Sequence, residues 1–445
     1  MLESRGNWST KAGFILAASG SAIGLGNIWK FPYITGDYGG GAFVLVYLIC
    51  VAVIGLPLMI SELIVGRRSQ KNAVTAFEKL HRENSPWKIV GWLGVASGFI
   101  ILSFYSVVAG WALAYIFKAI VGFSGTAEQI TGQFGGLAGN ASDSVMWHTL
   151  FMGMTIAIVI GGVKGGLERW SKILMPSLFI ILFGLMTYGL FFTNGGMQAV
   201  SFLFKPDFSK LTSEAILSAM GHAFFTLSLG MGAMITYGSY LKTQEGILKD
   251  AIIISFLDTL IALMAGIAIF SLVFHYGMEP GQSVGLIFKT LPVLFAETGR
   301  WISVPFFILL TFAALTSAIS ILEVVVAYFI DEKHWSRKKA TLLLGGIIYL
   351  VGILSAVGKW TVPFRGSDQG FLDIFDYIST NYMLPIGGFL TCLYVAYVVD
   401  EKIKQSEFGS SGALYMTLSI LLRFVTPVAV FIVILNGLDL LPFVE

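Results

Sequence analysis

The stretch AASGSAIGLGNIWKFPY, residues 17–33, combines a glycine cluster with polar groups that could bind a small cation. Three glycines lie within seven residues of an apolar segment: Gly20, Gly24 and Gly26. Glycine costs about 1 kcal/mol relative to alanine inside a helix, so the cluster predicts a break in a membrane helix. Backbone groups freed at membrane depth must face protein, water or a ligand. Carbonyl oxygens beside Ser21 and Asn27 therefore predict an oxygen-rich site in the middle of the membrane.

A second segment, FFTLSLGMGAMITYGSY (residues 224–240), repeats this pattern. Gly230 and Gly232 lie near its middle, beside Thr226 and Ser228. A single glycine pair can serve only close helix packing. Two glycine-interrupted spans at corresponding positions of two halves instead indicate the central site of a transporter.

The elements that position these segments follow from composition. Of the 445 residues, 56% are apolar and 12% are charged, and the mean hydropathy of +0.80 excludes an ordinary soluble domain. Apolar windows of about 20 residues, the length that crosses a bilayer as a helix, recur along the chain. They predict an all-α polytopic membrane protein with eleven spans, near residues 11–35, 42–66, 89–121, 145–162, 170–192, 213–240, 247–275, 301–330, 339–357, 371–399 and 411–437.

The distribution of lysine and arginine sets the expected orientation. Cations gather before the first span and in the loops after the second and eighth, whereas residues 122–144 contain none. We therefore expect a multi-pass protein of the plasma (inner) membrane with a cytoplasmic N-terminus and, from the odd number of spans, an extracellular C-terminus. The same topology explains the net charge of +2, so no nucleic-acid partner is implied. Cys50 and Cys392 lie inside apolar spans and predict neither a disulfide framework nor a thiolate metal site.

The chain is expected to form one transmembrane domain over residues 1–445. The broken spans are the first and the sixth, and a spacing of five spans inverts membrane orientation between halves. This predicts a 5+5 inverted repeat, with halves at about 11–192 and 213–399 and an extra helix at 411–437.

Four motifs in the same order, GSAIGLGNIWKFPY, GGGAF (residues 39–43), FFTLSLGMG and LTSAIS (residues 315–320), resemble signatures of the neurotransmitter:sodium symporter family. The chain is most similar to the bacterial amino-acid transporters of that family, over essentially its whole length. The resemblance implies unwound first and sixth helices, with the lipid bilayer, sodium and an amino acid as partners. The sequence carries no signal for the oligomeric state.

The resemblance implies two sodium sites. The first would use Ala22, Asn27, Thr226 and Asp258, and the second Gly20, Ile23, Ala313, Thr316 and Ser317. All of these ligands are hard oxygens, which suit an alkali cation. Because the carboxylate of Asp258 already supplies a negative charge, we expect transport without chloride. Protonation of Asp258 on the return step, which would give proton counter-movement, is a further hypothesis.

The resemblance also implies a substrate site. The carboxylate of an amino acid would meet the amides of Leu25 and Gly26 and the hydroxyl of Tyr105. Gly24 lacks the aspartate that amine-transporting relatives carry there, which favours a zwitterionic amino acid. Met231 is a flexible residue that suits larger hydrophobic or aromatic side chains. The full set is Ala22, Gly24, Leu25, Gly26, Ile101, Tyr105, Phe225, Thr226, Ser228, Met231, Ser317 and Ile321.

Gates and supporting residues follow from the same resemblance. The cytoplasmic gate would be Arg5 with Asp331, packed by Trp8 and Tyr240, and the extracellular gate Lys30 with Asp376. Glu62 would support the unwound part of the sixth helix, and Gly166 and Pro176 would let the start of the fifth helix unwind. His222 is interpreted as a packing residue outside the site.

These expectations predict sodium-coupled symport of neutral hydrophobic or aromatic L-amino acids into the cell by alternating access. Two alternatives share the architecture: a proton-coupled amino-acid transporter, which needs no sodium, and a sensor that binds an amino acid without moving it. An enzyme is not expected, because the sequence contains no HExxH motif and no phosphate-binding glycine loop.

Overall fold

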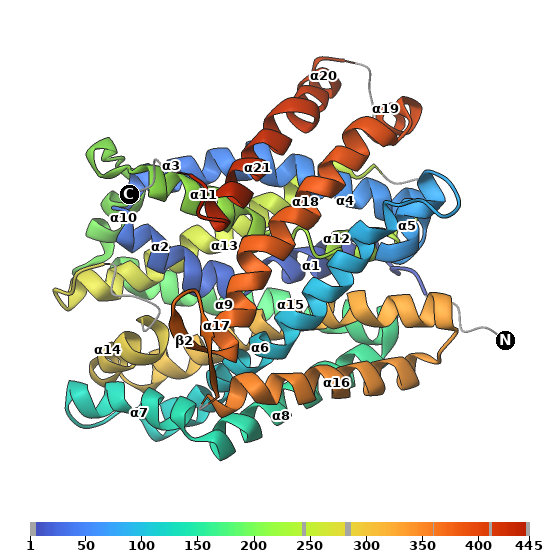
Figure 1. Cartoon of the computed structure of the whole chain (residues 1–445). Coiled ribbons are helices and arrows are strands. Elements are labelled where there is room, and N and C mark those ends of the chain that lie inside the picture. The colour runs from blue at the N-terminus through green and yellow to red at the C-terminus, as the bar shows by residue number, and fades with distance from the viewer. Residues whose placement is uncertain (1–5, 243–245, 281–285, 359, 409–411, 442–445) are drawn as a thin grey trace.

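A computed structural model describes residues 6–242, 246–280, 286–358, 360–408 and 412–441 and shows a bundle of long helices (Figure 1). The first five spans and their connections comprise α1 (Lys11–Ala22), α2 (Phe31–Asp37), α3 (Gly41–Cys50), α4 (Leu56–Ser69), α5 (Ala73–Leu80), α6 (Lys88–Val121), α7 (Ala127–Gly139), α8 (Ala141–Ile160), α9 (Arg169–Phe192) and α10 (Gly196–Phe204).

The rest of the chain comprises α11 (Ser213–Thr226), α12 (Ala233–Gly238), α13 (Leu248–His275), α14 (Leu291–Thr298), α15 (Arg300–Lys333), α16 (Arg337–Val357), β1 (Thr361–Phe364), β2 (Ser367–Gly370), α17 (Phe371–Ile378), α18 (Leu384–Leu393), α19 (Glu401–Phe408), α20 (Ala413–Ile420) and α21 (Thr426–Gly437). A short 3-10 turn spans Phe208–Lys210, and π-helical turns span Gly26–Lys30, Val51–Gly55, Val163–Glu168, Leu286–Thr290, Ser379–Met383, Tyr394–Val398 and Leu421–Val425.

The predicted spans correspond to these helices with shifts of a few residues at the ends. Within the described residues, nine helices are long and apolar enough to cross a membrane, and α1 with the helical stretch Gly26–Asp37 forms a tenth span that is bent by 50°. The sixth predicted span falls below that length criterion because it is divided into α11 and the six-residue α12. Counted as one broken span, it completes the predicted eleven.

The two breaks lie where the glycines predict them, although not at every glycine. The first helix continues through Gly20 to Ala22, and its backbone turns extended at Ile23, with φ −72° and ψ 102°. In the sixth helix, Gly230 and Gly232 take positive φ of 83° and 76°, which glycine adopts without strain. Gly238 lies inside α12, where an added Cβ would come 3.1 Å from the carbonyl oxygen of Leu63.

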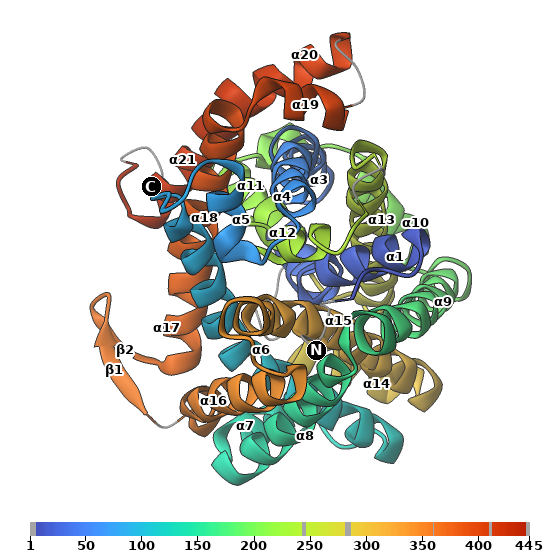
Figure 2. The same ribbon diagram turned by 90° about the vertical axis from the view of Figure 1, so that its right-hand side faces the viewer.

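The broken helices lie in the middle of the bundle. Figure 2 shows α1 and α12 close to α15 and α6, with α9, α13, α16 and α18 around them. The most apolar window of α15 is 89% buried, the highest share of any candidate span. The β1–β2 hairpin, in which Thr361 pairs with Gly370, projects from the side of the bundle (Figure 2).

Candidate functional site

A small central cavity of about 30 Å³ lies between the two breaks. Its lining comes from the first break, α6, the sixth-helix break and α15. It includes all twelve residues predicted to contact substrate, together with one that was not in that set: Ser21, Ala22, Gly24, Leu25, Gly26, Ile101, Tyr105, Phe225, Thr226, Ser228, Met231, Ser317 and Ile321.

One side of the cavity is polar and narrow. The backbone N–H of Leu25 donates to the hydroxyl of Tyr105, at 3.4 Å between nitrogen and oxygen. An added Cβ at Gly24 would come 2.6 Å from the Ser317 hydroxyl oxygen and 3.2 Å from that of Tyr105. No L side chain fits at position 24 without displacing these groups. The backbone N–H of Gly24 donates to the side-chain oxygen of Asn27 at 3.0 Å, so the first break directs backbone donors at polar side chains.

The other side is apolar and adjustable. Ile101, Met231 and Ile321 are each at most 3% exposed and carry only carbon and sulfur beyond the backbone. Met231 stands between Gly230 and Gly232, the two glycines with positive φ. A flexible side chain between two such hinges can change its position to fit different guests.

Ser21 joins the two breaks to α15. Its carbonyl oxygen accepts from the hydroxyls of Ser228 at 2.7 Å and Ser317 at 3.1 Å, and its own hydroxyl donates to that of Ser320 at 2.7 Å. Ser228 itself has a positive φ of 53°. The sequence placed Ser21 beside the break but gave no sign that one carbonyl would be shared by two helices more than 200 residues away.

Asp258 forms a buried oxygen cluster beside the cavity. The side-chain amide of Asn27 donates to its Oδ1 at 2.7 Å, and the Thr226 hydroxyl lies 3.1 Å from the same atom. Tyr47, which the sequence did not single out, donates to Oδ2 at 3.4 Å. Asp258 is 0% exposed, and no lysine or arginine in the described ranges lies within ion-pair distance of it.

A buried carboxylate without a cationic side chain is stable only when it is protonated or when another positive charge balances it. The oxygens of Asp258, Asn27 and Thr226 are hard ligands, and among the described residues no three His, Cys, Asp or Glu side chains are grouped to hold a transition metal. The cluster therefore fits an alkali cation such as sodium. Ala22, the fourth predicted ligand, lines the adjoining cavity.

The predicted second sodium site lies where α1 meets α15. The hydroxyl of Thr316 donates to the carbonyl of Ala313 at 3.0 Å, and Ser317 lies 3.4 Å from the same carbonyl. An added Cβ at Gly20 would come 3.2 Å from the Cβ of Thr316, so the two helices are in close contact. Ile23 follows at the extended turn of the first break. Gly20, Ala313, Thr316 and Ser317 thus lie at one contact between α1 and α15.

A larger cavity of about 210 Å³ adjoins the central one. Leu25, Gly26, Tyr105 and Phe225 line both cavities, so the Phe225 ring forms part of the wall between them. Lys30 and Asp376 both line the larger cavity, but no ion pair joins them in the described part of the chain. The Lys30 ammonium instead lies 4.7 Å from the centre of the Phe225 ring.

Away from the larger cavity, Trp8 and Tyr240 pack together and take part in a polar network. The Trp8 indole N–H donates to the carbonyl of Tyr237 at 3.0 Å, and the Trp8 ring centre lies 6.1 Å from that of Tyr240. The Tyr240 hydroxyl donates to Glu323 at 2.6 Å. Arg337 binds the two oxygens of Glu323 at 2.7 and 2.9 Å.

Neither Glu323 nor Arg337 was predicted, because a buried partner on another helix leaves no local sequence pattern. The predicted gate residue Arg5 lies outside the described residues. Its predicted partner Asp331 accepts from the backbone N–H of Asn72 at 3.2 Å and from its side-chain amide at 3.0 Å. Lys11 forms an ion pair with Asp250 at 3.0 Å, which the sequence also did not indicate.

Two supporting predictions can be placed. A carboxylate oxygen of Glu62, on α4, accepts from the N–H of Gly230 at 2.7 Å and so holds the sixth-helix break. Gly166 lies in the π-helical turn Val163–Glu168, where an added Cβ would come 2.0 Å from the carbonyl oxygen of Ile158. Pro176 lies inside α9. The start of the fifth span, which comprises the turn Val163–Glu168 and α9, is helical in this structure.

His222 lies outside the central cavity. It is 1% exposed and packs against Phe31 and Tyr47, with ring centres 6.0 and 5.3 Å away. This arrangement agrees with its interpretation as a packing residue.

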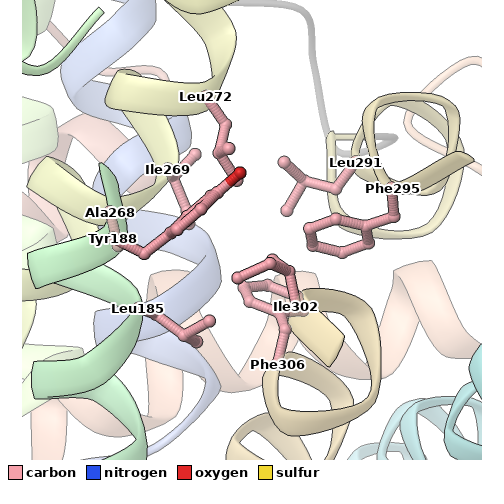
Figure 3. A pocket seen from close by; sticks show the side chains of 9 residues that line it. All are labelled: Leu185, Tyr188, Ala268, Ile269, Leu272, Leu291, Phe295, Ile302 and Phe306. Carbon is pink, nitrogen blue, oxygen red and sulfur yellow. The ribbon is translucent and has the colours of Figure 1, made fainter. Parts of the chain in front are cut away.

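A further cavity of about 10 Å³ lies among α9, α13, α14 and α15 (Figure 3). Tyr188 brings the only side-chain oxygen among its nine lining residues, and the rest are aliphatic or phenylalanine. It has neither the polar end nor the size of an amino-acid site, and we interpret it as a packing gap.

Comparison with known proteins assigns the family. The sequence profile of the "Sodium:neurotransmitter symporter family" matches residues 5–125 and 138–442. The "Uncharacterized sodium-dependent transporter YhdH" of Bacillus subtilis (strain 168) is 40% identical over 445 residues, with 98% of each protein covered. The "Uncharacterized sodium-dependent transporter MJ1319" of Methanocaldococcus jannaschii is 34% identical and covers 90% of this chain and 84% of its own length.

A solved structure agrees in both fold and sequence. The crystal structure of MhsT in complex with L-phenylalanine matches with a TM-score of 0.89 and 44% identity, over 98% of this chain and 100% of that one. The predicted fold class is thereby confirmed, and so is the prediction of a sodium-dependent transporter and not an enzyme. The chain is a multi-pass membrane transporter and belongs to the sodium:neurotransmitter symporter family.

Proposed function

We propose that this transporter imports neutral hydrophobic or aromatic L-amino acids, driven by sodium that moves in the same direction. The observation that carries the proposal is the polarity of the central cavity. The backbone of the first break, the hydroxyl of Tyr105 and the side chain of Ser317 lie together in its lining, and Ile101, Met231 and Ile321 make up an apolar part. An amino acid has the same division between its charged backbone groups and an apolar side chain.

The residues around the cavity also exclude charged substrates. None of the thirteen lining side chains is ionisable at neutral pH, so a lysine or glutamate side chain would be desolvated without a partner. The substrate carboxylate would lie at the N-terminal end of the turn Gly26–Lys30. Its ammonium would meet the sixth-helix break near Phe225, Thr226 and Ser228.

Shared residues support coupling to two sodium ions. Thr226 lines the cavity and also contacts Asp258, and Ser317 lines the cavity and also contacts the carbonyl of Ala313. An ion that orders either cluster therefore orders one wall of the substrate cavity. This is the physical requirement for mutual stabilisation of ion and substrate.

The size of the cavity bears on which amino acids fit. A volume of about 30 Å³ holds only one or two water molecules, so an amino acid requires the lining to move outward. Met231 can move most easily, since it stands between Gly230 and Gly232. The similar protein MhsT forms a complex with L-phenylalanine, which supports a large apolar or aromatic substrate here.

The membrane placement belongs to the same proposal. The cation-rich loops would face the cytoplasm of a plasma (inner) membrane, with the N-terminus inside and the C-terminus outside. The halves of the inverted repeat would be residues 11–192 and 213–399, with 411–437 as an additional helix.

Uptake into proteoliposomes tests the proposal. Radiolabelled leucine, phenylalanine, tyrosine and tryptophan are offered with an inward sodium gradient or with potassium in its place, and unlabelled competitors rank the substrates. Sodium-dependent uptake that lysine and glutamate do not inhibit is the expected result. Uptake without sodium would replace the proposal with proton coupling, and binding without uptake would replace it with a sensor.

A further inference from the structure

The N-terminal end of α1 is held by a carboxylate from a distant segment. Glu168, the last residue of the turn Val163–Glu168, accepts from the backbone N–H of Ser9 at 2.7 Å and from the Thr10 hydroxyl at 3.1 Å. The hydroxyl of Ser9 donates to the same carboxylate. Glu168 is only 1% exposed, whereas Ser9 and Thr10 are exposed, so these bonds are partly shielded from water. They attach the residues that precede and cap α1 to the start of the fifth span, directly before α9.

The surroundings are shaped for this contact. An added Cβ at Gly13 would come 2.3 Å from Oε1 of Glu168, so only glycine leaves room for the carboxylate against α1. Lys172, one turn further along α9, forms an ion pair with Glu168 at 2.6 Å. The charge of Glu168 is therefore balanced from its own helix, and its bonds to Ser9 and Thr10 are charge-assisted.

A second contact joins the same two helices nearer the sodium sites. An added Cβ at Gly20 would come 3.0 Å from the sulfur of Met175 and 3.2 Å from the Cβ of Thr316. Gly20 and Thr316 are predicted ligands of the second sodium ion. Met175 immediately precedes Pro176. The segment from Gly166 to Pro176 in the fifth span thus contacts the first span near each of its ends, through Glu168 and through Met175.

The segment between these contacts is the part of the fifth span with the fewest regular helical hydrogen bonds. It begins in a π-helical turn, which follows Gly162 with a positive φ of 73°. Pro176 has no N–H, so one backbone hydrogen bond of α9 is missing. Wide turns and proline are both places at which helices deform. Unwinding here costs fewer hydrogen bonds than elsewhere in α9.

We propose that Glu168 is a positioning residue that makes the start of the first helix move with the start of the fifth. When the turn that carries Glu168 unwinds, Ser9 and Thr10 lose their acceptor, and the N-terminal half of α1 is released from α9. Gly20 then separates from Met175 and Thr316, and the second sodium site opens. The role in sodium release rests on the proposed function, whereas the linkage between the two segments does not.

Hydrogen–deuterium exchange of the full-length protein in detergent, without sodium or amino acid, tests the linkage. The readouts are peptides that cover residues 8–18 and 161–170. In Glu168→Gln we expect both peptides to exchange roughly tenfold faster, the order expected when a charge-assisted hydrogen bond is lost. Lys172→Met should accelerate only residues 161–170, because Lys172 pairs with Glu168 from within the same helix, one turn along α9.

Glu78→Gln is the matched control. Glu78 also accepts from a backbone N–H, that of Asn84, and pairs with a lysine, Lys88, at 2.6 Å, but it lies on α5. The Glu78→Gln substitution should leave the exchange rates of both peptides unchanged. A double variant, Ser9→Ala with Thr10→Ala, removes the hydroxyl donors from the other side and should accelerate residues 161–170 as well.

Three results would overturn the proposal: unchanged exchange of residues 8–18 in Glu168→Gln, the same pattern in Lys172→Met as in Glu168→Gln, or unchanged exchange of residues 161–170 in the double variant. Faster exchange in α16 as well would show that Glu168→Gln does not fold. In that case the exchange of residues 161–170 in the double variant decides whether the linkage exists. Because none of these readouts involves transport, a failure of sodium-coupled uptake would be recognised separately.

Discussion

The side-chain amide of Asn27 donates to Oδ1 of Asp258 at 2.7 Å, and this bond links the first-helix break to the seventh span. Both residues are 0% exposed. A carboxylate in this position can bind a sodium ion directly and can also order the break through Asn27. The affinity for sodium and the shape of the substrate cavity should therefore depend on the same side chain.

Replacing Asp258 with asparagine should weaken sodium binding. Loss of the buried charge should raise the sodium concentration for half-maximal uptake at least about tenfold, because removal of one partner of a buried ion pair costs several kcal/mol. Uptake at varied sodium measures this. Asp143→Asn removes an exposed carboxylate at the start of α8 and should change nothing. An unchanged sodium dependence in Asp258→Asn would show that Asp258 does not bind sodium.

Transport should not require chloride. If Asp258 supplies the negative charge that offsets sodium, replacement of chloride by gluconate should leave the initial uptake rate of the wild type unchanged within error. A loss of half or more of the rate on chloride removal would contradict this role of Asp258.

Proton counter-movement through Asp258 makes a separate prediction. If the carboxylate returns protonated, uptake into vesicles at internal pH 6 should exceed uptake at internal pH 8, and Asp258→Asn should abolish the difference. Rates insensitive to internal pH in both proteins would end this hypothesis.

Tyr105→Phe should weaken substrate binding without affecting the fold. The hydroxyl that contacts the N–H of Leu25 is lost, and with it a hydrogen bond to the substrate carboxylate, worth about 1.5–3 kcal/mol for a charged group, or roughly 10- to 150-fold in affinity. Tyr115→Phe on the same helix loses a hydroxyl that donates to the carbonyl of Phe288 at 2.9 Å, away from the site. Amino-acid binding to both variants separates the two roles, and equal losses would argue against the assignment of Tyr105.

Gly24→Ala should abolish high-affinity binding. Its methyl group would come 2.6 Å from the Ser317 oxygen, closer than side-chain contacts allow. Gly136→Ala on α7 serves as the control, because a Cβ added at Gly136 has no other atom within 4 Å. Binding within about threefold of wild type for Gly24→Ala, a difference of less than 1 kcal/mol, would show that the cavity is larger than the structure indicates.

Met231→Phe should shift specificity toward smaller substrates. The rigid ring fills the apolar side of the cavity, so tryptophan should lose more affinity than leucine, by about tenfold or 1.4 kcal/mol in their ratio. Competition against labelled leucine measures the ratio. Equal changes for the two amino acids would indicate that Met231 does not contact the substrate side chain.

The two breaks could be predicted from the sequence, because clustered glycines weaken a continuous helix and so mark a break within an apolar span. The residues around the cavity were predicted from the resemblance to the family. The break positions were less certain: Gly20 and Gly238 lie inside helices, since close contacts with Thr316 and with the carbonyl of Leu63 also require glycine. Contacts such as Tyr240–Glu323 and Ser9–Glu168 were not predicted. They join residues 83 and 159 positions apart, and no local periodicity encodes such a pairing.

The shared wall at Phe225 has a kinetic consequence. On the side of the larger cavity, the Phe225 ring under Lys30 forms part of the wall of the central cavity, and side chains change rotamer within nanoseconds. On the other side, α1 is fixed by Trp8, by Lys11 and by its link to Glu168, so exit there requires helix movement on the scale of microseconds to milliseconds. We therefore expect loading from the larger cavity to be fast and reversible, and the turnover rate to be set by the opposite end of the bundle.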